Sequence, residues 1–341
     1  MDLLIVESNA KAKTIQKYLG KQAAVGACMG HVQDLPTSGK EGRKAMWASR
    51  GDALPNPPWE WTEKAQSVIN NLLKIAKDKK VERVLVGTDP DREGEFIAWR
   101  LAEIFGELAP VVRVRFHEIT PEAIQEAIDA AGHVDEHLVD AAKVRRFMDR
   151  LIGYRTSRFS RSWGLRSMGR VQTPTLGFVV ERENEIDAFV PIKYWSSDIV
   201  AQTIDFNVRF HEKDDEDAWR DGKGRINLHR TGDEPLAQRA FKALLSAATV
   251  DIADVTDSTS TRKPQLPFTT DTLLAEAGSR FRWRPALTMR TAQGLYESGH
   301  ITYMRTDSTR TNPTARATVR QTIEKLWDTT YVGAVAPPAA K

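Results

Sequence analysis

Cysteine is almost absent from this sequence, since Cys28 is the only one among 341 residues. A single cysteine excludes an internal disulfide and a zinc site built on several cysteines. No stretch approaches the roughly 18 uninterrupted apolar residues that a membrane span needs. The first residues, MDLLIVES, form a strand-like run without the pattern of a signal peptide. These absences predict a cytoplasmic protein without a membrane partner.

A large net charge is also missing, because 49 lysines and arginines nearly balance 46 acidic residues and leave a net charge of +3. The charges are nevertheless unevenly distributed. Residues 143–170 contain eight arginines and one lysine but a single acid, Asp149, whereas residues 212–221 contain six acids. A solvent-exposed face usually contains charges of both signs and many lysines. Arginine, with its planar guanidinium group, is better suited to binding phosphate. The arginine block therefore predicts a polyanionic partner.

Residues 81–105 read as one buried strand, an acidic turn and one helix. Residues 84–86 form a short apolar run that fits a strand covered on both faces, and the apolar residues of 97–105 recur at helical spacing. The turn lies at the carboxyl end of the strand, where open α/β sheets place their sites. Three carboxylates occupy alternate positions in it: Asp89, Asp91 and Glu93.

Helix capping could explain one or two acidic residues in this turn, because they offset the helix dipole. Three closely spaced carboxylates repel one another unless a cation lies among them, and oxygen ligands select Mg²⁺ or Ca²⁺. The spacing also resembles the start of an EF-hand loop, but the twelfth position is Arg100 instead of a bidentate Glu. The residues therefore favour a Mg²⁺ site over capping and over calcium storage.

Glu7 ends another predicted strand, over residues 2–7. If that strand neighbours residues 84–86 in a parallel sheet, Glu7 joins the acidic turn and completes a four-carboxylate site. Lys11 lies one helical turn beyond Glu7, and a surface helix start explains both residues equally well. His31, which follows the next strand, could contact phosphate or pack structurally.

The elements predict an α/β fold with a Rossmann-like parallel sheet, followed by mixed α and β segments. We expect four regions: an α/β domain over 1–130, an arginine-rich helical region over 131–190, a β-rich region over 191–257, and a helical region over 258–341.

Within these regions, residues 36–61 are expected to leave the α/β core as a long excursion. A helix is predicted over 136–152, and another is expected to be capped by Thr173 and to end near residue 186. Period-two alternation predicts half-exposed strands near residues 204–210 and a further strand over 249–255.

Six segments, in order, resemble the signature segments of type IA DNA topoisomerases: LLIVESNAKAKTI, GHVQDLP, GTDPDREGEFIAW, RRFMDRLIGY, GRVQTPTL and ITYMRTDSTR. The acidic set of Glu7, Asp89, Asp91 and Glu93 is similar to the metal-binding pattern of the family's Toprim domain. The resemblance extends from residue 1 to about residue 315. It implies Mg²⁺ as cofactor and a helical domain that carries the catalytic tyrosine.

The resemblance implies a transesterification in which Tyr303 attacks a phosphodiester of single-stranded DNA. A 5′-phosphotyrosyl link and a free 3′-hydroxyl form, the other strand passes, and the break reseals, which relaxes negatively supercoiled DNA. A covalent phosphotyrosine conserves bond energy, so no ATP is needed, and the sequence contains no G-x-x-x-x-G-K-[ST] phosphate loop. Arg305 is expected to lie on the same side as Tyr303 and to supply positive charge. Glu7 matches the family's proton-transfer carboxylate and Lys11 its assisting lysine.

The resemblance and the arginine block together predict the DNA contacts. Arginines would hold the phosphates of one strand, and an amide could read a base edge or a phosphate. The expected contact residues are His31, Arg146, Asp149, Arg150, Arg155, Ser167, Gly169, Arg170, Gln172 and Arg305.

The chain is expected to correspond to an N-terminal portion of the family that ends in or just after the tyrosine domain, and to be a monomer. Two other functions stay open. The first is a nucleotidyl transferase or nuclease on the same Toprim core. The second is a truncated, non-catalytic fragment that binds single-stranded DNA.

Overall fold

The structure is a computed structural model and describes residues 1–36, 59–201, 204–247, 249–262 and 264–333. Most of the predicted excursion, including Trp47, lies outside these residues. No helix among them is long and apolar enough to cross a membrane.

The chain forms two compact units, each described here by itself. The first unit comprises Met1–Phe159 and Pro264–Lys341, and the second comprises Ser160–Lys263.

A four-stranded parallel sheet forms the centre of the first unit, in the order β2-β1-β5-β6. Side chains alternate between its faces, as strand geometry requires, so Leu3 and Ile5 of β1 pack on one side while Leu4 and Val6 pack on the other. The predicted Rossmann-like parallel sheet is therefore confirmed. The strands are β1 (Asp2–Val6), β2 (Ala23–Ala27), β5 (Arg83–Val86) and β6 (Val111–Arg113).

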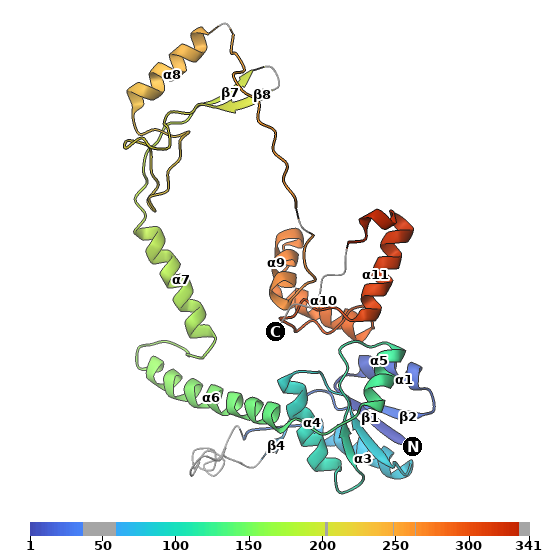
Figure 1. Cartoon of the computed structure of the whole chain (residues 1–341). Coiled ribbons are helices and arrows are strands. Elements are labelled where there is room, and N and C mark those ends of the chain that lie inside the picture. Colours follow the sequence, from blue (N-terminus) through green and yellow to red (C-terminus); the bar gives the residue numbers. More distant parts are fainter. Residues whose placement is uncertain (37–58, 202–203, 248, 263, 334–341) are drawn as a thin grey trace. The chain divides into compact units, whose positions relative to one another are not determined.

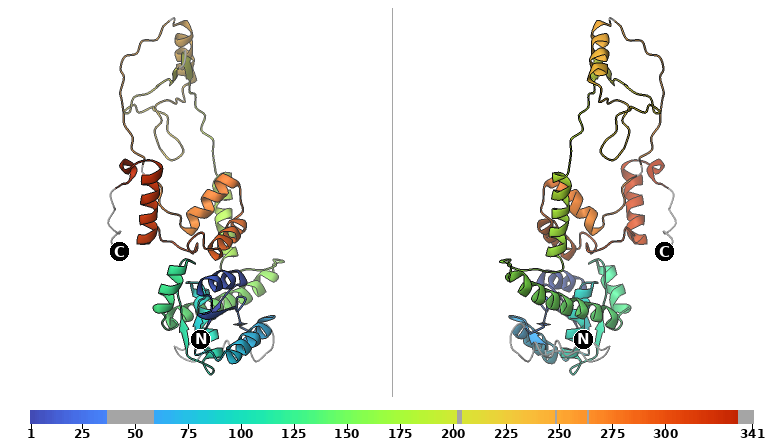
Figure 2. Two further views of the ribbon diagram at one scale, coloured as in Figure 1. Left: turned by 90° about the vertical axis from the view of Figure 1, so that its right-hand side faces the viewer. Right: turned by 90° about the vertical axis from the view of Figure 1, so that its left-hand side faces the viewer.

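Helices cover both faces of this sheet, which explains why its strands read as continuous apolar runs (Figures 1 and 2). Two helices pack on the face of Leu3 and Ile5: α3 (Ala65–Asp78) and α4 (Arg92–Phe105). Two others pack on the opposite face: α1 (Asn9–Leu19) and α5 (Pro121–Asp129).

A short antiparallel pair extends the first unit beside α4. Trp59 precedes its second strand and contacts the rings of Phe96 and Trp99, at centroid distances of 5.3 and 5.7 Å. The strands are β3 (Gln33–Asp34) and β4 (Glu60–Trp61).

The segment after residue 264 returns to the first unit. Tyr296, Tyr303 and Met304 belong to the same apolar cluster as Leu4 and Val6, so this segment packs on the α1 and α5 side of the sheet. Its elements are α9 (Thr270–Phe281), α10 (Pro285–Glu297), α11 (Pro313–Leu326) and the 3₁₀ turn η1 (Thr329–Tyr331).

The helix predicted over 136–152 continues nine residues further, as α6 (Glu136–Arg161). The arginine-rich sequence after residue 152 contains no proline, and Gly153 lies inside the helix, so nothing ends the helix before Arg161.

The second unit has a smaller proportion of buried residues. Its helix α7 (Gln172–Asp187) buries none, and α8 (Glu234–Ser246) buries only Ala237. Its strands β7 (Asp198–Ala201) and β8 (Ile204–Asn207) form one antiparallel pair.

Two predictions for the second unit are wrong. Residues 249–255 form no strand, because no described segment offers them a backbone partner. Thr173 does not cap α7, which begins one residue earlier at Gln172; instead the Thr173 hydroxyl accepts a hydrogen bond from the Gly169 N–H, at 3.1 Å.

Candidate active site

Glu7 and Asp89 meet at the carboxyl ends of two neighbouring strands. β1 and β5 pair directly, and the backbone N–H of Asp89 donates to Glu7 Oε1 at 3.1 Å. Lys11 Nζ donates to Glu7 Oε2 at 3.4 Å and also to Asp89 Oδ1. Because the Lys11 side chain is 0% exposed, its charge acts within this pair of carboxylates. The expected meeting of Glu7 with the acidic turn is therefore observed.

One lysine does not neutralise these two carboxylates. Burial, followed by the negative charge of Glu7, raises the pKa of Asp89 to about 7, although Lys11 acts in the opposite direction. The pair thus retains excess negative charge, which favours a bound proton or a bound cation.

Arg113 holds the backbone of the acidic turn in place. Its guanidinium is buried, pairs with Glu95 at 2.9 Å, and donates to the carbonyl oxygens of Thr88 and Asp89, both at 2.9 Å. Gly94 permits a close approach within the turn, since a Cβ atom there would lie 2.1 Å from the Asp89 carbonyl oxygen. The geometry of the turn therefore depends on a buried ion pair and on one glycine.

Asp91 connects the acidic turn to the tyrosine segment. Its Oδ1 accepts from the Gly94 N–H at 2.8 Å and so caps α4. Its Oδ2 accepts from the Tyr303 hydroxyl and from Arg305 Nη1, the latter at 3.2 Å. Tyr303 and Arg305 thus reach the same carboxylate oxygen, as expected for two residues on one side of the segment.

The tyrosine segment is irregular rather than strand-like, and backbone hydrogen bonds fix its position. The Tyr303 N–H donates to the His117 carbonyl oxygen at 2.7 Å. At the start of α9, the Thr270 hydroxyl donates to the Met304 carbonyl oxygen at 2.8 Å. Gly299 ends the preceding helix with φ of 79°, and a Cβ atom there would lie 2.6 Å from a backbone oxygen of Ile119.

The Tyr303 hydroxyl is protonated in this arrangement. Burial and the negative charges of Asp89 and Asp91 raise the pKa of Tyr303, whereas the positive charge of Arg305 lowers it. The phenol therefore donates to Asp91, and a further positive charge would be needed to stabilise the phenolate.

Glu93 forms a separate cluster with His31 and Arg146. Its Oε2 lies 3.2 Å from His31 Nε2 and accepts from Arg146 Nη2 at 2.9 Å. The hydrogen bond from His31, with the nearby Arg146 charge, lowers the pKa of Glu93 to about 2. Arg146 Nη1 also donates to Asp34 Oδ1 at 2.7 Å. The predicted DNA contacts His31 and Arg146 are therefore engaged with acids at the turn.

Asp149 and Arg150 lie beside Arg146 on α6, around a cleft of about 420 Å³. Arg150 donates to the carbonyl oxygens of Leu35, at 3.4 Å, and of Pro36. Arg155 is exposed further along the same helix. Asp149 and Arg150 share the predicted helix with Arg146, and Arg155 joins them because α6 extends beyond residue 152.

The remaining predicted contacts belong to the second unit and surround the start of α7. Gln172 Nε2 donates to the Ser167 hydroxyl at 3.2 Å, across the turn that contains Gly169 and Arg170. The turn and the first residues of α7 therefore bring Ser167 and Gln172 together.

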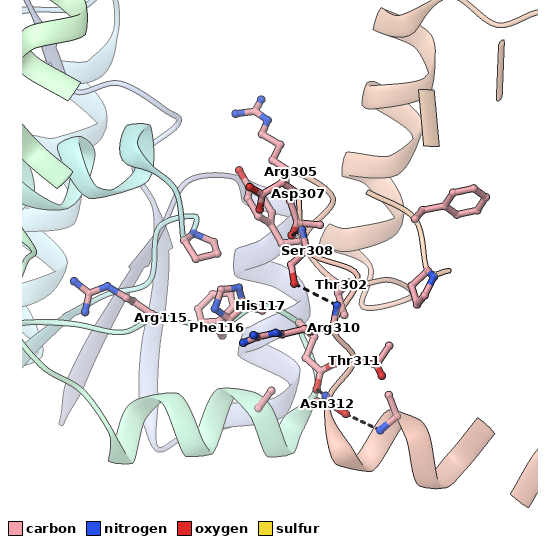
Figure 3. A pocket seen from close by; sticks show the side chains of 18 of the residues that line it. Arg115, Phe116, His117, Thr302, Arg305, Asp307, Ser308, Arg310, Thr311 and Asn312 are labelled. Atoms are coloured by element: carbon pink, nitrogen blue, oxygen red, sulfur yellow. Dashed lines mark hydrogen bonds between the residues drawn. The ribbon is translucent and has the colours of Figure 1, made fainter. Parts of the chain in front are cut away.

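Two cavities adjoin the acidic turn, and Arg305 lines both of them. The first, of about 560 Å³, is lined by all four predicted metal ligands together with His31, Arg305 and residues of α10. The second, of about 1210 Å³, is shown in Figure 3, where Arg115, Phe116 and His117 line one side and the segment from Thr302 to Asn312 lines the other. Tyr303 and Arg305 both line the second cavity.

The four carboxylates offer the oxygen donors that suit a hard divalent cation, and the raised pKa of Asp89 marks uncompensated negative charge. Among the described residues, however, no three of the four bring their oxygens within 4.8 Å of one another. Each carboxylate is instead engaged by other side chains. Lys11 contacts Glu7 and Asp89. Asp91 accepts from Tyr303 and Arg305, and Glu93 contacts Arg146 and His31. The donor set fits Mg²⁺ chemically, and closer ligation would require side-chain rearrangement.

Several residues of the site were missed by sequence reasoning. Arg113 and Glu95 form a buried pair, and their only signal is charge within otherwise apolar elements. Glu297 accepts from the Ser8 hydroxyl at 2.9 Å, and Tyr296 packs edge-on against Tyr303 with ring centroids 5.3 Å apart. Both lie at the end of α10, distant in sequence from β1, so local patterns could not place them there.

Two protein-family models match the chain: a Toprim domain over residues 2–119 and a DNA topoisomerase over residues 133–341. DNA topoisomerase 1 of Pseudomonas aeruginosa is 40% identical over 366 residues, covering 97% of this chain and 40% of the relative. DNA topoisomerase 1 of Escherichia coli (strain K12) is 37% identical over 361 residues, covering 97% and 40%. The chain thus spans about 40% of the length of these curated relatives.

A similar solved structure is full-length topoisomerase I from Thermotoga maritima. Its TM-score is 0.76 at 32% sequence identity, and the match covers 97% of this chain and 54% of that one.

Proposed function

Because the chain belongs to the type IA family of DNA topoisomerases, we propose that it carries the strand-cleaving centre of such an enzyme. The reaction is an ATP-independent transesterification that opens one DNA strand and reseals it. In the whole protein, passage of the other strand through the break would relax negatively supercoiled DNA.

The observation that carries this proposal is the hydrogen bond from the Tyr303 hydroxyl to Asp91 Oδ2. It joins residues 212 positions apart and brings a tyrosine onto the acidic turn. A nuclease or nucleotidyl transferase that uses only the acidic turn has no need of a tyrosine there. The contact therefore favours covalent catalysis by a phenol.

Tyr303 acts as the nucleophile. Its oxygen forms a bond to the DNA phosphorus, and the bond from phosphorus to the 3′-oxygen breaks. The phenolic proton passes to the adjacent Asp91 Oδ2, and the departing 3′-oxygen takes up a proton. Arg305 stabilises the charge that develops on the phosphoryl oxygens. The reverse sequence reseals the strand.

Glu7 is the carboxylate that we assign to proton transfer at the 3′-oxygen. Its contact with Lys11 orients it, and the neighbouring Asp89, with its pKa near 7, can hold or release a proton at neutral pH. Mg²⁺, held by Glu7, Asp89, Asp91 and Glu93, would neutralise phosphate charge and keep the DNA backbone in place for resealing.

Single-stranded DNA is the proposed partner of this centre. Arg146, Arg150 and Arg155 on α6 and Arg170 in the second unit would bind its phosphates, while Gln172 supplies an amide. No nucleotide cofactor takes part, and the protein is proposed to act as a monomer in the cytoplasm.

Covalent trapping tests the proposal. The chain is incubated with an end-labelled single-stranded oligonucleotide and Mg²⁺, and the reaction is stopped with denaturant. We expect a labelled protein–DNA band that disappears in Tyr303→Phe and persists in Tyr331→Phe, because Tyr331 is 71% exposed and distant from the acidic turn in sequence.

Other outcomes would identify the alternatives. Cleavage that persists in Tyr303→Phe would indicate a Toprim nuclease. Salt-sensitive binding of DNA without any adduct in the wild-type chain would indicate a non-catalytic fragment.

A further inference from the structure

A buried histidine in the second unit lies against two aspartates. His211 is 5% exposed, and its Nδ1 lies 3.8 Å from Asp215 Oδ2 and 3.9 Å from Asp217 Oδ1. Its other ring nitrogen, Nε2, is buried without a hydrogen-bond partner among the described residues. Nothing in the proposed strand-cleavage reaction uses these side chains.

Backbone hydrogen bonds hold the three residues in this arrangement. The N–H groups of Phe210 and His211 donate to the Leu228 carbonyl oxygen, at 2.9 and 3.3 Å. The Glu212 N–H donates to Asp215 Oδ2 at 2.7 Å, which closes a tight turn. These bonds therefore fix His211 and Asp215, and Asp217 follows two residues later in the same turn.

The observed distances do not correspond to hydrogen bonds, which join nitrogen and oxygen at about 2.7–3.2 Å. An imidazole that makes no hydrogen bond among the described residues needs an explanation, and an ion bound at Nδ1, the nitrogen that faces both aspartates, is one. Atoms that share an ion with bonds of about 2.1 Å can lie up to about 4 Å apart, which matches the spacing here.

The charge around this group also favours a cation. Residues 212–221 contain six acids and only two basic residues, Lys213 and Arg220. Asp217 has 86% of its side chain exposed, so an ion can enter from solvent and keep a water ligand.

We propose that His211, Asp215 and Asp217 form a binding site for a divalent transition-metal ion such as Zn²⁺. One imidazole nitrogen with two carboxylate oxygens suits Zn²⁺, whereas Mg²⁺ and Ca²⁺ prefer oxygen ligands alone. The ion would cross-link the turn to the segment that contains His211, so its role is structural. The site is thus distinct in chemistry from the acidic turn of the Toprim domain.

The test measures Zn²⁺ binding by the whole chain in saturating Mg²⁺, by competition with a chromophoric chelator. Asp217→Asn removes one ligand, and no described hydrogen bond involves the Asp217 side chain. Asp214→Asn is the matched control, because it removes the same charge from the same segment without touching the group of three. We expect affinity for Zn²⁺ to fall at least about 10-fold in Asp217→Asn and to stay within about 2-fold in Asp214→Asn.

Thermal unfolding gives a second readout. Zn²⁺ should raise the unfolding temperature of the wild-type chain and of Asp214→Asn, but not that of Asp217→Asn. The proposal is overturned if the wild-type chain binds no Zn²⁺, or if both variants bind it equally. In that case His211 and the two aspartates form an ion pair only.

Discussion

At the scale of single residues, Asp89 differs from the other acids of the turn. Asp89 is mostly buried and shares Lys11 with Glu7, and its pKa is raised to about 7. The pKa of Glu93 is instead lowered by His31 and Arg146, so Glu93 stays ionised. A carboxylate that lacks full compensation is suited to a cation that arrives with the substrate. We therefore propose that Asp89 serves the resealing step more than the attack by Tyr303, which contacts Asp91 instead.

Replacement of Asp89 should accordingly separate the two half-reactions. In Asp89→Ala we expect resealing to slow by about 100-fold, the effect of losing one electrostatic contact to the reacting charge, and cleavage to change much less. The measurement traps the covalent adduct, then follows rejoining after a rise in salt. Asp140→Ala, at an exposed position on α6, is the control. Equal loss of both steps in Asp89→Ala would refute this division of roles.

At the scale of elements, the junction between β5 and α4 depends on the absence of a side chain at Gly94. A methyl group there would press on the Asp89 backbone, which cannot move without disturbing the contacts from Arg113. We expect Gly94→Ala to lower the free energy of unfolding by roughly 1–3 kcal/mol, as overpacking does.

Denaturant unfolding measures this change. Gly153→Ala serves as the control, because Gly153 lies within α6 with open space around its Cα. That substitution should raise the stability by about 0.5–1 kcal/mol through the better helix propensity of alanine. Similar stabilities for the two variants would contradict the steric argument.

The same junction shows how far the sequence alone determines the site. Buried apolar runs predict β1 and β5, and the shared edge of parallel strands then brings Glu7 to Asp89. Arg113 could not be predicted, because an arginine in a three-residue strand reads as a solvent-facing residue until its partner Glu95 is known. The resemblance to a family singled out both Asp91 and Tyr303, but their contact was not predicted, since no local pattern joins residues so distant in the chain.

Errors at the element scale have physical causes as well. Apolar and polar residues alternate over 249–255 as in a strand, but no described segment pairs with them. Such alternation indicates which side chains share a face and does not specify a pairing strand. α6 continues past residue 152 because arginine is a good helix former. These arginines were considered for their charge and not for their helix propensity.

At the scale of the whole molecule, the predicted DNA contacts are divided between the two units. Those on α6 lie in the first unit, and those near the start of α7 lie in the second. A single strand that contacts both groups would release counterions from each, so both should contribute to the salt dependence of binding.

We therefore expect Arg146→Ala and Arg170→Ala each to weaken single-strand binding and to reduce the slope of log K against log salt by about 0.7 per lost phosphate contact. Fluorescence anisotropy at several salt concentrations measures the slope. Arg182→Ala on α7 should leave it unchanged, because Arg182 is not one of the predicted contact residues. An unaltered slope in the first two variants would count against the proposed contacts.

The two carboxylate oxygens of Asp91 have different partners. Oδ1 accepts from the Gly94 N–H in the first turn of α4, and Oδ2 accepts from the Tyr303 hydroxyl. In the proposed reaction the phenol would leave Asp91 with the DNA end, while Oδ1 could still accept from the Gly94 N–H. Movement of Tyr303 away from the acidic turn would therefore leave this cap of α4 in place. If Tyr303 is the nucleophile proposed above, this division of Asp91 lets the tyrosine depart and return with the start of α4 still capped.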